Sequence, residues 1–193
     1  GGIGLFTGDG TGTLVNQESG VITVTNSGKG MASAGWPYYN FTGIIENNGS
    51  IIVEGSGTGI SIGGNIDIQG GTAVNDGKIQ LNGGGESTGV YVAGYNNFIN
   101  NGEISGTAAG TDQTTLVSAN NQAQIVNAEN GVLKGTGNTN GIYISNAYPS
   151  HKSTVTNDGL IVTENGYGIY AIGTDVVNNG TIETGTRALG IYS

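Results

Sequence analysis

A short motif of the form Asn-Asn-Gly-x-Ile recurs along the chain and constrains the possible folds more than any other feature of the sequence. A degenerate copy surrounds Gly20, and six clearer copies occupy residues 46–51, 74–79, 99–104, 128–133, 156–161 and 177–182. From Gly20 to Gly180 the anchoring glycines advance 160 residues in six steps, a period of about 27 residues. A fixed period of this length is typical of a solenoid, in which each repeat packs on its two neighbours.

Each repeat contains two further apolar segments. A second motif, of the form Gly-Ile-Tyr-Ile, occupies residues 59–62, 89–92, 141–144, 168–171 and 190–193, with a degraded copy at 115–118. A third short apolar run precedes the next anchor. Short runs with period-2 alternation, broken by turn residues, indicate strands and not helices. We therefore predict an all-β fold, a parallel β-solenoid (β-helix) with three short strands per coil of about 27 residues. About seven coils are expected, which begin near residues 16, 45, 74, 99, 127, 155 and 177.

The same alternation assigns a core. Composition alone favours disorder, because 39 of the 193 residues are Gly and only 35% are hydrophobic. Stacked like residues bury one another, however, so a modest apolar fraction is enough for a solenoid. The first strands are expected to point one column inward: Ile22, Ile51, Ile79, Ile104, Leu133, Ile161 and Ile182. The second strands are expected to add Ile60, Val90, Leu116, Ile142, Ile169 and Ile191.

The Asn-Gly corners have a structural interpretation that needs no ligand. Asn and Gly tolerate positive φ, so we expect them to form the turn at little steric cost. Stacked Asn side chains can also hydrogen-bond from coil to coil as a ladder. The structural corner residues so assigned include Asn48, Gly49, Asn101, Gly102, Asn130, Gly131, Asn179 and Gly180.

Charge and composition exclude several classes of partner. The chain carries 5 Lys and Arg against 14 Asp and Glu, a formal net charge of -9, which disfavours nucleic acid or an anionic membrane surface. There is no cysteine, so disulfides and thiolate metal sites are excluded. The longest apolar runs span a few residues, and we expect no direct membrane insertion by this segment. No cofactor and no metal are predicted.

The unit Asn-Asn-Gly-x-Ile followed by Gly-Ile-Tyr resembles the passenger domains of Gram-negative autotransporters (type V secretion), in particular the fusobacterial type, from about Asn16 onward. Related repeats occur in filamentous-haemagglutinin-like exoproteins. The resemblance implies a right-handed parallel β-helix that acts as a surface adhesin in virulence, and parallel crossovers generally prefer that hand. It also implies that residues 1–193 are one solenoid segment of a longer passenger, secreted to the bacterial cell surface and anchored through an outer-membrane barrel outside the segment. The implied partners are host or bacterial surface glycans or proteins, or a second copy of the chain.

Parallel β-helices also include polysaccharide lyases and hydrolases, so an enzyme is an alternative. A lyase requires clustered acidic Ca²⁺ ligands with a basic residue, and a hydrolase of this fold requires paired Asp residues near His, Arg and Lys. The chain contains a single His, His151, a single Arg, Arg187, and no Asp-Asp pair. Its solvent-facing acids fall mostly in different coils, among them Glu54, Asp67, Glu103 and Glu183. We therefore predict no enzymatic activity.

Departures from the repeat are the places where we expect binding, because a regular rod has few distinctive surfaces. The larger insertions fall at one corner, between the second and third strands, in alternate coils. They place aromatic residues beside Asn and hydroxyl groups, a combination that suits sugar rings. The candidate binding residues are Trp36, Tyr38, Tyr39, Tyr95, Asn96, Tyr148 and His151. The alternative is that Trp36 and its neighbours only cap or pad the rod.

A second candidate surface is a row of tyrosines. If Ile142 and Ile144 face inward, Tyr143 faces outward, and the repeat places equivalent residues in other coils. Ser61 and Val117 take that position in the remaining coils. Such a row either stabilises the sheet or mediates lateral self-association. The residues of this stripe are Tyr91, Tyr143, Tyr170 and Tyr192.

The predicted function is that of a non-enzymatic bacterial cell-surface adhesin that displays loops on a stiff rod. Two alternatives stay open beside it. One is a self-associating structural spacer or filament subunit, because exposed coil ends can stack on one another. The other is a polysaccharide-processing β-helix enzyme whose activity would depend on His151 or Arg187.

Overall fold

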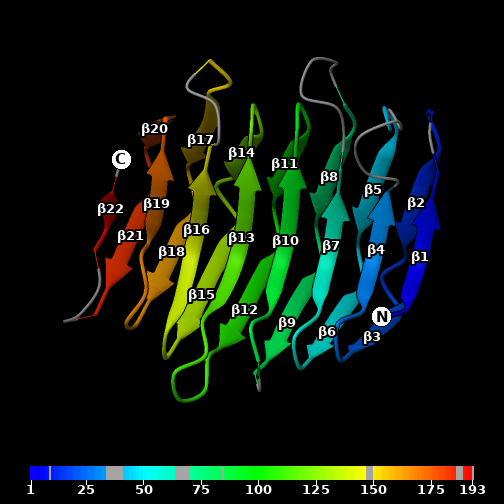
Figure 1. The fold of residues 1–193 in the computed structure, drawn as a ribbon, viewed down its shortest axis with the longest axis horizontal. Coiled ribbons are helices and arrows are strands. Elements are labelled where there is room, and N and C mark those ends of the chain that lie inside the picture. Colours follow the sequence, from blue (N-terminus) through cyan, green and yellow to red (C-terminus); the bar gives the residue numbers. More distant parts are fainter. Residues whose placement is uncertain are drawn as a thin grey trace.

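The computed structural model describes residues 1–8, 10–33, 41–63, 70–83, 85–146, 150–185 and 189–192. These residues form 22 β-strands in three parallel sheets. Successive strands enter the three sheets in turn, so every third strand returns to the same sheet one coil further along the rod (Figure 1). The predicted all-β parallel β-solenoid with three strands per coil is confirmed. The described part of the chain holds no helix of a length and hydropathy that could cross a membrane.

We number the sheets in the order in which the chain enters them. Sheet 1 contains eight strands: β1 (Ile3–Thr7), β4 (Lys29–Ser33), β7 (Thr58–Ile62), β10 (Thr88–Ala93), β13 (Thr114–Asn120), β16 (Thr139–Ser145), β19 (Ile169–Ile172) and β22 (Ile191–Tyr192). Sheet 2 contains seven: β2 (Thr13–Asn16), β5 (Ile44–Asn47), β8 (Thr72–Asn75), β11 (Asn97–Asn100), β14 (Gln124–Asn127), β17 (Ser153–Asn157) and β20 (Thr174–Asn178). Sheet 3 contains seven: β3 (Val21–Thr25), β6 (Ser50–Glu54), β9 (Lys78–Asn82), β12 (Glu103–Thr107), β15 (Val132–Thr136), β18 (Leu160–Thr163) and β21 (Thr181–Thr184).

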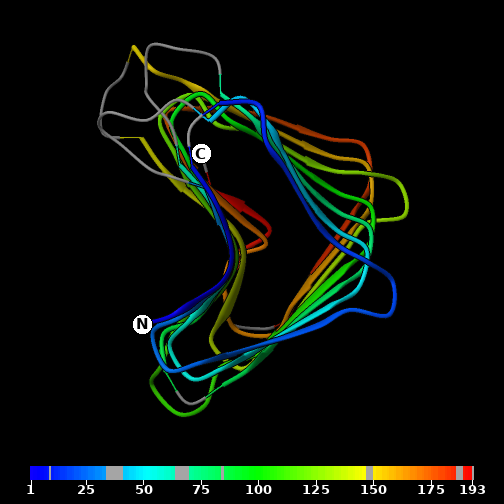
Figure 2. The same cartoon turned by 90° about the vertical axis from the view of Figure 1, so that its right-hand side faces the viewer.

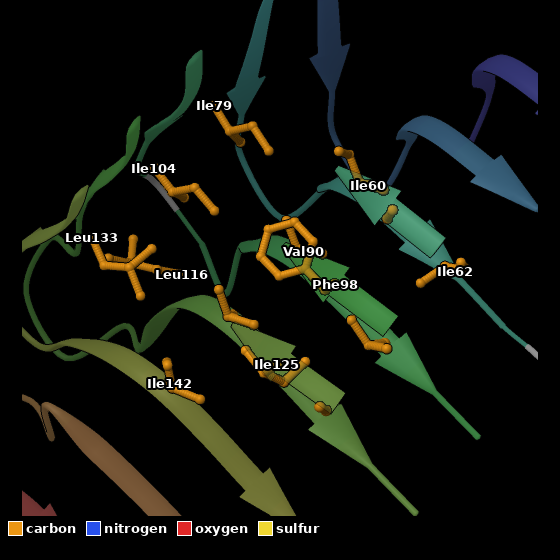
Figure 3. Close-up of a cluster of buried hydrophobic side chains, with 14 of the residues drawn as sticks. Ile60, Ile62, Ile79, Val90, Phe98, Ile104, Leu116, Ile125, Leu133 and Ile142 are labelled. Carbon is orange, nitrogen blue, oxygen red and sulfur yellow. The ribbon is translucent and has the colours of Figure 1, made fainter. Parts of the chain in front are cut away.

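The core consists of apolar columns that stack from coil to coil. In sheet 3 the register joins the predicted column from Ile22 to Ile182 without a break. Its interior members are at most 1% exposed, and its two end members are partly buried. Phe98 and Ile125 of sheet 2 face this column, and side chains of all three sheets meet in the centre of the rod (Figure 3). A modest apolar fraction is sufficient because each residue is covered by its equivalents in the adjacent coils.

The inward column of sheet 1 differs from the prediction by one residue in β13. Val117 pairs with Ile142, so Val117 and not Leu116 takes the predicted inward position. The prediction was wrong because the degraded copy of the motif carries no glycine to anchor its alignment. Leu116 is nevertheless fully buried, and its Cδ2 atom lies 3.0 Å from where a Cβ atom on Gly106 would stand. Because β9 carries Leu81 in register with Gly106, Leu116 fills the space that this glycine leaves open in sheet 3.

The anchor glycines are needed for space and not for positive φ, which corrects the prediction for the Asn-Gly corners. Among the described residues, positive φ occurs at Asn26, Asn121, Gln122 and six glycines, none of which is an anchor. At Gly102 a Cβ atom would stand 2.2 Å from the carbonyl oxygen of Gly77 in the preceding coil. A Cβ atom would also stand 2.2 or 2.3 Å from a carbonyl oxygen at Gly49, Gly131 and Gly180. A side chain at these positions would push neighbouring coils apart.

Asparagines at the ends of the sheet 2 strands form a continuous hydrogen-bonded ladder, as the stacking prediction requires. In each step the Nδ2 atom of one Asn donates to the Oδ1 atom of the next Asn towards the C-terminus, over 2.7 or 2.8 Å. The five central side chains are at most 1% exposed. The members are Asn16, Asn47, Asn75, Asn100, Asn127, Asn157 and Asn178. Asn16 and Asn178 lie six coils apart, so their sequence separation of 162 residues gives an average coil of 27 residues.

The Asx position directly before each anchor glycine contributes less to this stacking. There the described residues form two exposed side-chain pairs between coils. Asn101 Nδ2 donates to Asp76 Oδ1 at 2.7 Å, and Asn179 Nδ2 donates to Asp158 Oδ1 at 2.8 Å. The asparagines at the ends of the sheet 2 strands therefore form the ladder, and these pairs of residues directly before the anchor glycines lie at the surface.

The rod is not round in cross-section. Seen along its long axis in Figure 2, sheet 1 bends inward, so that its outer face is concave. This face is flanked by the corner where the chain passes from sheet 1 to sheet 2 and by the corner where it passes from sheet 3 to sheet 1. Outward side chains of sheet 1 therefore share one concave surface that runs along the rod.

Candidate functional site

Several predicted binding residues belong to the corner between sheets 1 and 2. One connection runs from the end of β4 at Ser33 to the start of β5 at Ile44, and another from the end of β16 at Ser145 to the start of β17 at Ser153. The candidate residues in these two connections lie outside the described ranges: Trp36, Tyr38, Tyr39 and Tyr148. Their role in binding stays a prediction.

Long connections are not confined to that corner, which corrects the prediction on the insertions. Residues 108–113 connect β12 with β13 at the corner between sheets 3 and 1. Residues 63–71 connect β7 with β8 at the predicted corner, in a coil for which the sequence predicts no insertion. The concave face of sheet 1 thus has longer connections on both of its sides.

Tyr95 and Asn96 form a tight corner and differ in exposure. Tyr95 is 36% exposed, whereas Asn96 is fully buried. The Asn96 Oδ1 atom accepts a hydrogen bond from the Gly71 N–H group at 2.8 Å, and its Nδ2 atom donates to the Ala93 carbonyl oxygen at 2.5 Å. The Asn96 amide therefore braces two coils, and Tyr95 is the member of this candidate pair that a partner can reach.

His151 lies in a corner that another asparagine braces. His151 is partly buried, and its carbonyl oxygen accepts a hydrogen bond from the Gln122 N–H group at 3.1 Å. Asn146 Oδ1 accepts from the Asn121 N–H group at 2.8 Å, and Asn146 Nδ2 donates to the Gly173 carbonyl oxygen at 2.6 Å. These bonds tie three successive coils together. A role of His151 in binding or catalysis stays a prediction.

Tyr143, Tyr170 and Tyr192 form a continuous stack on the outer face of sheet 1. The strand register places them in one row. The ring centroids of Tyr143 and Tyr170 lie 4.7 Å apart with an interplanar angle of 6°, and those of Tyr170 and Tyr192 lie 5.0 Å apart with an angle of 3°. Rings stacked in this way cover one another's faces. The surface that they present therefore consists mainly of ring edges and hydroxyl groups.

Tyr167 extends the stack into a cluster that the sequence analysis did not single out. Its ring lies 4.9 Å from that of Tyr170 and 6.4 Å from that of Tyr192, tilted by 53° and 52°. Partial burial within the cluster raises the pKa of Tyr170 above its usual value of 10.0, and the neighbouring phenol groups of Tyr143, Tyr192 and Tyr167 raise it further. Tyr167 precedes β19 and stands outside the period-2 alternation, so the pattern gave no signal for it.

Towards the N-terminus the predicted stripe is interrupted. Tyr91 pairs with Ser61 on one side and with Ser118 on the other. Ser118, and not Val117 as predicted, therefore takes the outward position between Tyr91 and Tyr143. The Tyr91 hydroxyl oxygen accepts a hydrogen bond from Asn120 Nδ2 at 3.0 Å. The stripe thus divides into a separate Tyr91 and a packed cluster of Tyr143, Tyr167, Tyr170 and Tyr192, which we call the tyrosine cluster.

The ionisable side chains do not gather into a metal site in the described ranges. Within the described ranges no group of three or more His, Asp or Glu residues could hold a metal ion. The anchor corners line a shallow groove of about 450 Å³ whose lining includes Glu18, Asp76, Lys78 and Glu103. Arg187 and Asp67, which the enzyme alternative considered, lie outside the described residues.

Comparison of the chain with protein-family models, with curated proteins and with solved structures finds no match. The functional argument therefore depends on the fold and on the outer face of sheet 1. Tyrosines there combine an apolar ring with a polar hydroxyl, which suits ligands that have both kinds of surface.

Proposed function

We propose that the chain is a segment of a non-enzymatic bacterial cell-surface adhesin, in which a stiff solenoid holds a binding surface for glycans or proteins of other cells. The resemblance of its repeat to autotransporter passenger domains supports an extracellular location and an outer-membrane anchor outside residues 1–193. The solenoid fold supports the proposal because extended stacks of coils present long binding surfaces. The net charge of -9 favours partners other than nucleic acid.

The tyrosine cluster is the observation that carries this proposal. The strands that carry Tyr143, Tyr170 and Tyr192 belong to sheet 1, whose outer face is concave (Figure 2), and Tyr192 is 48% exposed. These tyrosines do not fill the core, because the inward positions of β16 and β19 belong to Ile142 and Ile169. Clustered tyrosines are common in recognition surfaces, since each supplies a large apolar area and a hydrogen-bonding group.

Binding of the purified chain to glycan arrays and to intact host and bacterial cells tests the proposal. The double variant Tyr143→Ser/Tyr170→Ser removes the two central rings of the cluster. It should bind at least about tenfold more weakly, equal to about 1.4 kcal/mol. Val21→Ser is the control, because it also replaces an exposed apolar side chain with Ser, on sheet 3 and away from the candidate binding residues.

Circular dichroism on both variants establishes that the β-structure is kept. An equal loss of binding in the double variant and in Val21→Ser would contradict a specific role of the tyrosine cluster. Failure of the unmodified chain to bind any glycan or cell in a saturable way would overturn the adhesin proposal itself.

Lateral self-association is a second candidate function, favoured by the row of exposed ring edges in Tyr143, Tyr170 and Tyr192. In that case the partner of the tyrosine cluster is the same cluster of a second copy. Cells that display the chain should then aggregate, and the double variant should abolish the aggregation while Val21→Ser preserves it. Aggregation that is unchanged in the double variant would contradict this function.

A further inference from the structure

A polar pocket lies beside the tyrosine cluster, at the corner between sheets 3 and 1. Its volume is about 320 Å³, at the lower end of the range of roughly 300–1,000 Å³ for small-molecule sites. Four successive coils contribute to it, from the segment before β13 to the segment before β22. The lining consists of Gln113, Asn138, Asn140, Asn165, Gly166, Tyr167 and Leu189.

Asn140 is the buried amide of this lining, and one of its polar atoms has no partner. The residue is 1% exposed. Its Oδ1 atom accepts a hydrogen bond from the Tyr167 N–H group at 3.0 Å, whereas its Nδ2 atom makes no hydrogen bond. A buried donor without an acceptor is costly, so such a group in a folded protein indicates a missing partner such as a ligand or an ordered water. An acceptor atom at the base of the pocket would satisfy Asn140 Nδ2.

The walls of the pocket are held in place by the surrounding coils. The carbonyl oxygen of Asn138 accepts a hydrogen bond from the Thr114 N–H group at 3.2 Å, and that of Tyr167 accepts from the Gly141 N–H group at 2.8 Å. The Tyr167 ring is in turn packed against Tyr170. A ligand would therefore enter a largely preformed site, which limits the entropy lost on binding.

The chemistry of the lining matches a neutral sugar. Asn140 offers a donor, and the side-chain amides of Gln113, Asn138 and Asn165 each carry a donor and an acceptor, as a ring with several hydroxyl groups requires. The Tyr167 ring and Leu189 offer apolar surfaces for the C–H faces of such a ring. None of the described lining residues carries a charge, which disfavours phosphates and acidic sugars.

We infer that this pocket binds a neutral hexopyranose unit, with Asn140 Nδ2 donating to a ligand oxygen and the Tyr167 ring covering one face of the sugar. The inference rests on the proposed adhesin function, because it names the glycan class that this rod recognises. It adds a site that the loops predicted at the corner between sheets 1 and 2 do not include.

Titration of the isotope-labelled chain with neutral methyl hexopyranosides, followed by NMR, tests the inference. The side-chain amide signals of Gln113, Asn138, Asn140 and Asn165 should shift in a saturable way with at least one of these sugars, whereas methyl glucuronide should leave them in place. Tyr167→Ala and Asn138→Ala should each weaken the affinity by about tenfold or more. Tyr167→Phe keeps the ring and should retain binding.

Asn130→Ala is the matched control, because this asparagine is exposed at a different corner. The inference is overturned if no neutral sugar shifts the pocket amides, or if saturable shifts occur only elsewhere; an ordered water then remains as the partner of Asn140 Nδ2. Cell binding that survives Asn138→Ala but not Tyr143→Ser/Tyr170→Ser would support the adhesin proposal and contradict the pocket. Sugar binding in the pocket by a chain that does not bind cells would support the pocket and contradict the adhesin proposal.

Discussion

Two columns of like side chains run along this rod with the same coil spacing, and they differ in burial and in continuity. The asparagine ladder of sheet 2 has a member in every coil from Asn16 to Asn178, and its central members are buried. The tyrosine row of sheet 1, which consists of Tyr91, Tyr143, Tyr170 and Tyr192, is interrupted at Ser118, and its members are partly exposed. A buried amide needs a partner on each side, whereas an exposed phenol can use water. The ladder must therefore be complete, and the tyrosine row can vary from coil to coil.

The more regular of the two columns is therefore not the one that is available for binding. The ladder is the more regular of the two columns, yet its polar atoms are consumed by their own neighbours and leave little for a partner. The tyrosine row is less regular, and its side chains are partly exposed. In a solenoid, therefore, a perfectly repeated residue indicates architecture, and a residue repeated only in some coils indicates where the surface has been specialised.

The largest effect is expected at the centre of the ladder. Asn100→Ala removes the bonds to Asn75 and to Asn127. The buried Asn127 Oδ1 acceptor then loses its partner, and Asn75 Nδ2 keeps only two long bonds of 3.4 Å to backbone carbonyl oxygens. Loss of a buried partner costs roughly 1–3 kcal/mol, so the free energy of unfolding should fall by about 2–5 kcal/mol for the two groups together. Urea denaturation followed by circular dichroism measures this change.

The adjacent variant Asn101→Ala is the control for the ladder. Its side chain makes an exposed bond to Asp76, and the loss should be below about 1 kcal/mol. Equal losses for the two variants would show that burial does not distinguish the ladder from the surface pairs.

A smaller loss is expected where the coils approach most closely. Gly102→Ala would place a Cβ atom 2.2 Å from the carbonyl oxygen of Gly77, and the resulting displacement of the coils should cost about 1–3 kcal/mol. At Gly8 no atom lies within 4 Å of an added Cβ atom, so Gly8→Ala should change stability by less than about 0.5 kcal/mol. The same urea experiment compares them. A neutral Gly102→Ala would refute the steric explanation of the anchors.

The tyrosine row should contribute less to stability than either feature. Tyr170→Ser removes three ring pairs, two stacked and one tilted, each expected to contribute about 0.2–1 kcal/mol. The thermal unfolding midpoint should therefore fall only slightly, while the binding proposed for the tyrosine cluster is lost. A loss as large as that of Asn100→Ala would make the tyrosine row structural and remove the contrast between the two columns.

The smallest effect is expected from pH. Because partial burial raises the pKa of Tyr170 above 10.0, the folded chain holds this proton more tightly than the unfolded chain. The resulting stability is fully present below about pH 10 and is lost as the pH rises through the folded-state pKa. Phenolate absorbance should show a late ionisation phase that disappears in Tyr170→Phe. Persistence of that phase in the variant would assign it to another residue.

The fold could be predicted from two independent signals. The period of about 27 residues indicates the coil, and the period-2 alternation of apolar residues indicates the strands. The prediction failed where a coil lacks its glycine, as at Leu116. Asn16 and Asn127 were missed as ladder members because two extra residues separate each of them from the next anchor glycine. Aligning the coils from the sheet 2 strands, and not from the glycines, places both in the ladder.

The candidate site was predictable only in part. Alternation gives the outward direction of Tyr143, but contact with Tyr167 depends on how the chain enters β19, which no local pattern encodes. The pocket at Asn140 gathers residues from four coils, so it has no sequence motif of its own. The recurring motif showed that the corners need glycine, but the reason inferred from it, positive φ, was wrong, because an added Cβ atom would meet a carbonyl oxygen of the preceding coil.

Every bond of the asparagine ladder points the same way, with its donor directed to the C-terminal side. Peptide-like amides carry dipoles of about 3.5 D that add when aligned, whereas β-sheets have only small net dipoles. The rod therefore has an electrical polarity along its axis, positive at Asn178 and negative at Asn16. A carboxylate should be tolerated better near Asn178 and a cation better near Asn16, just as the two termini of a helix select opposite ions.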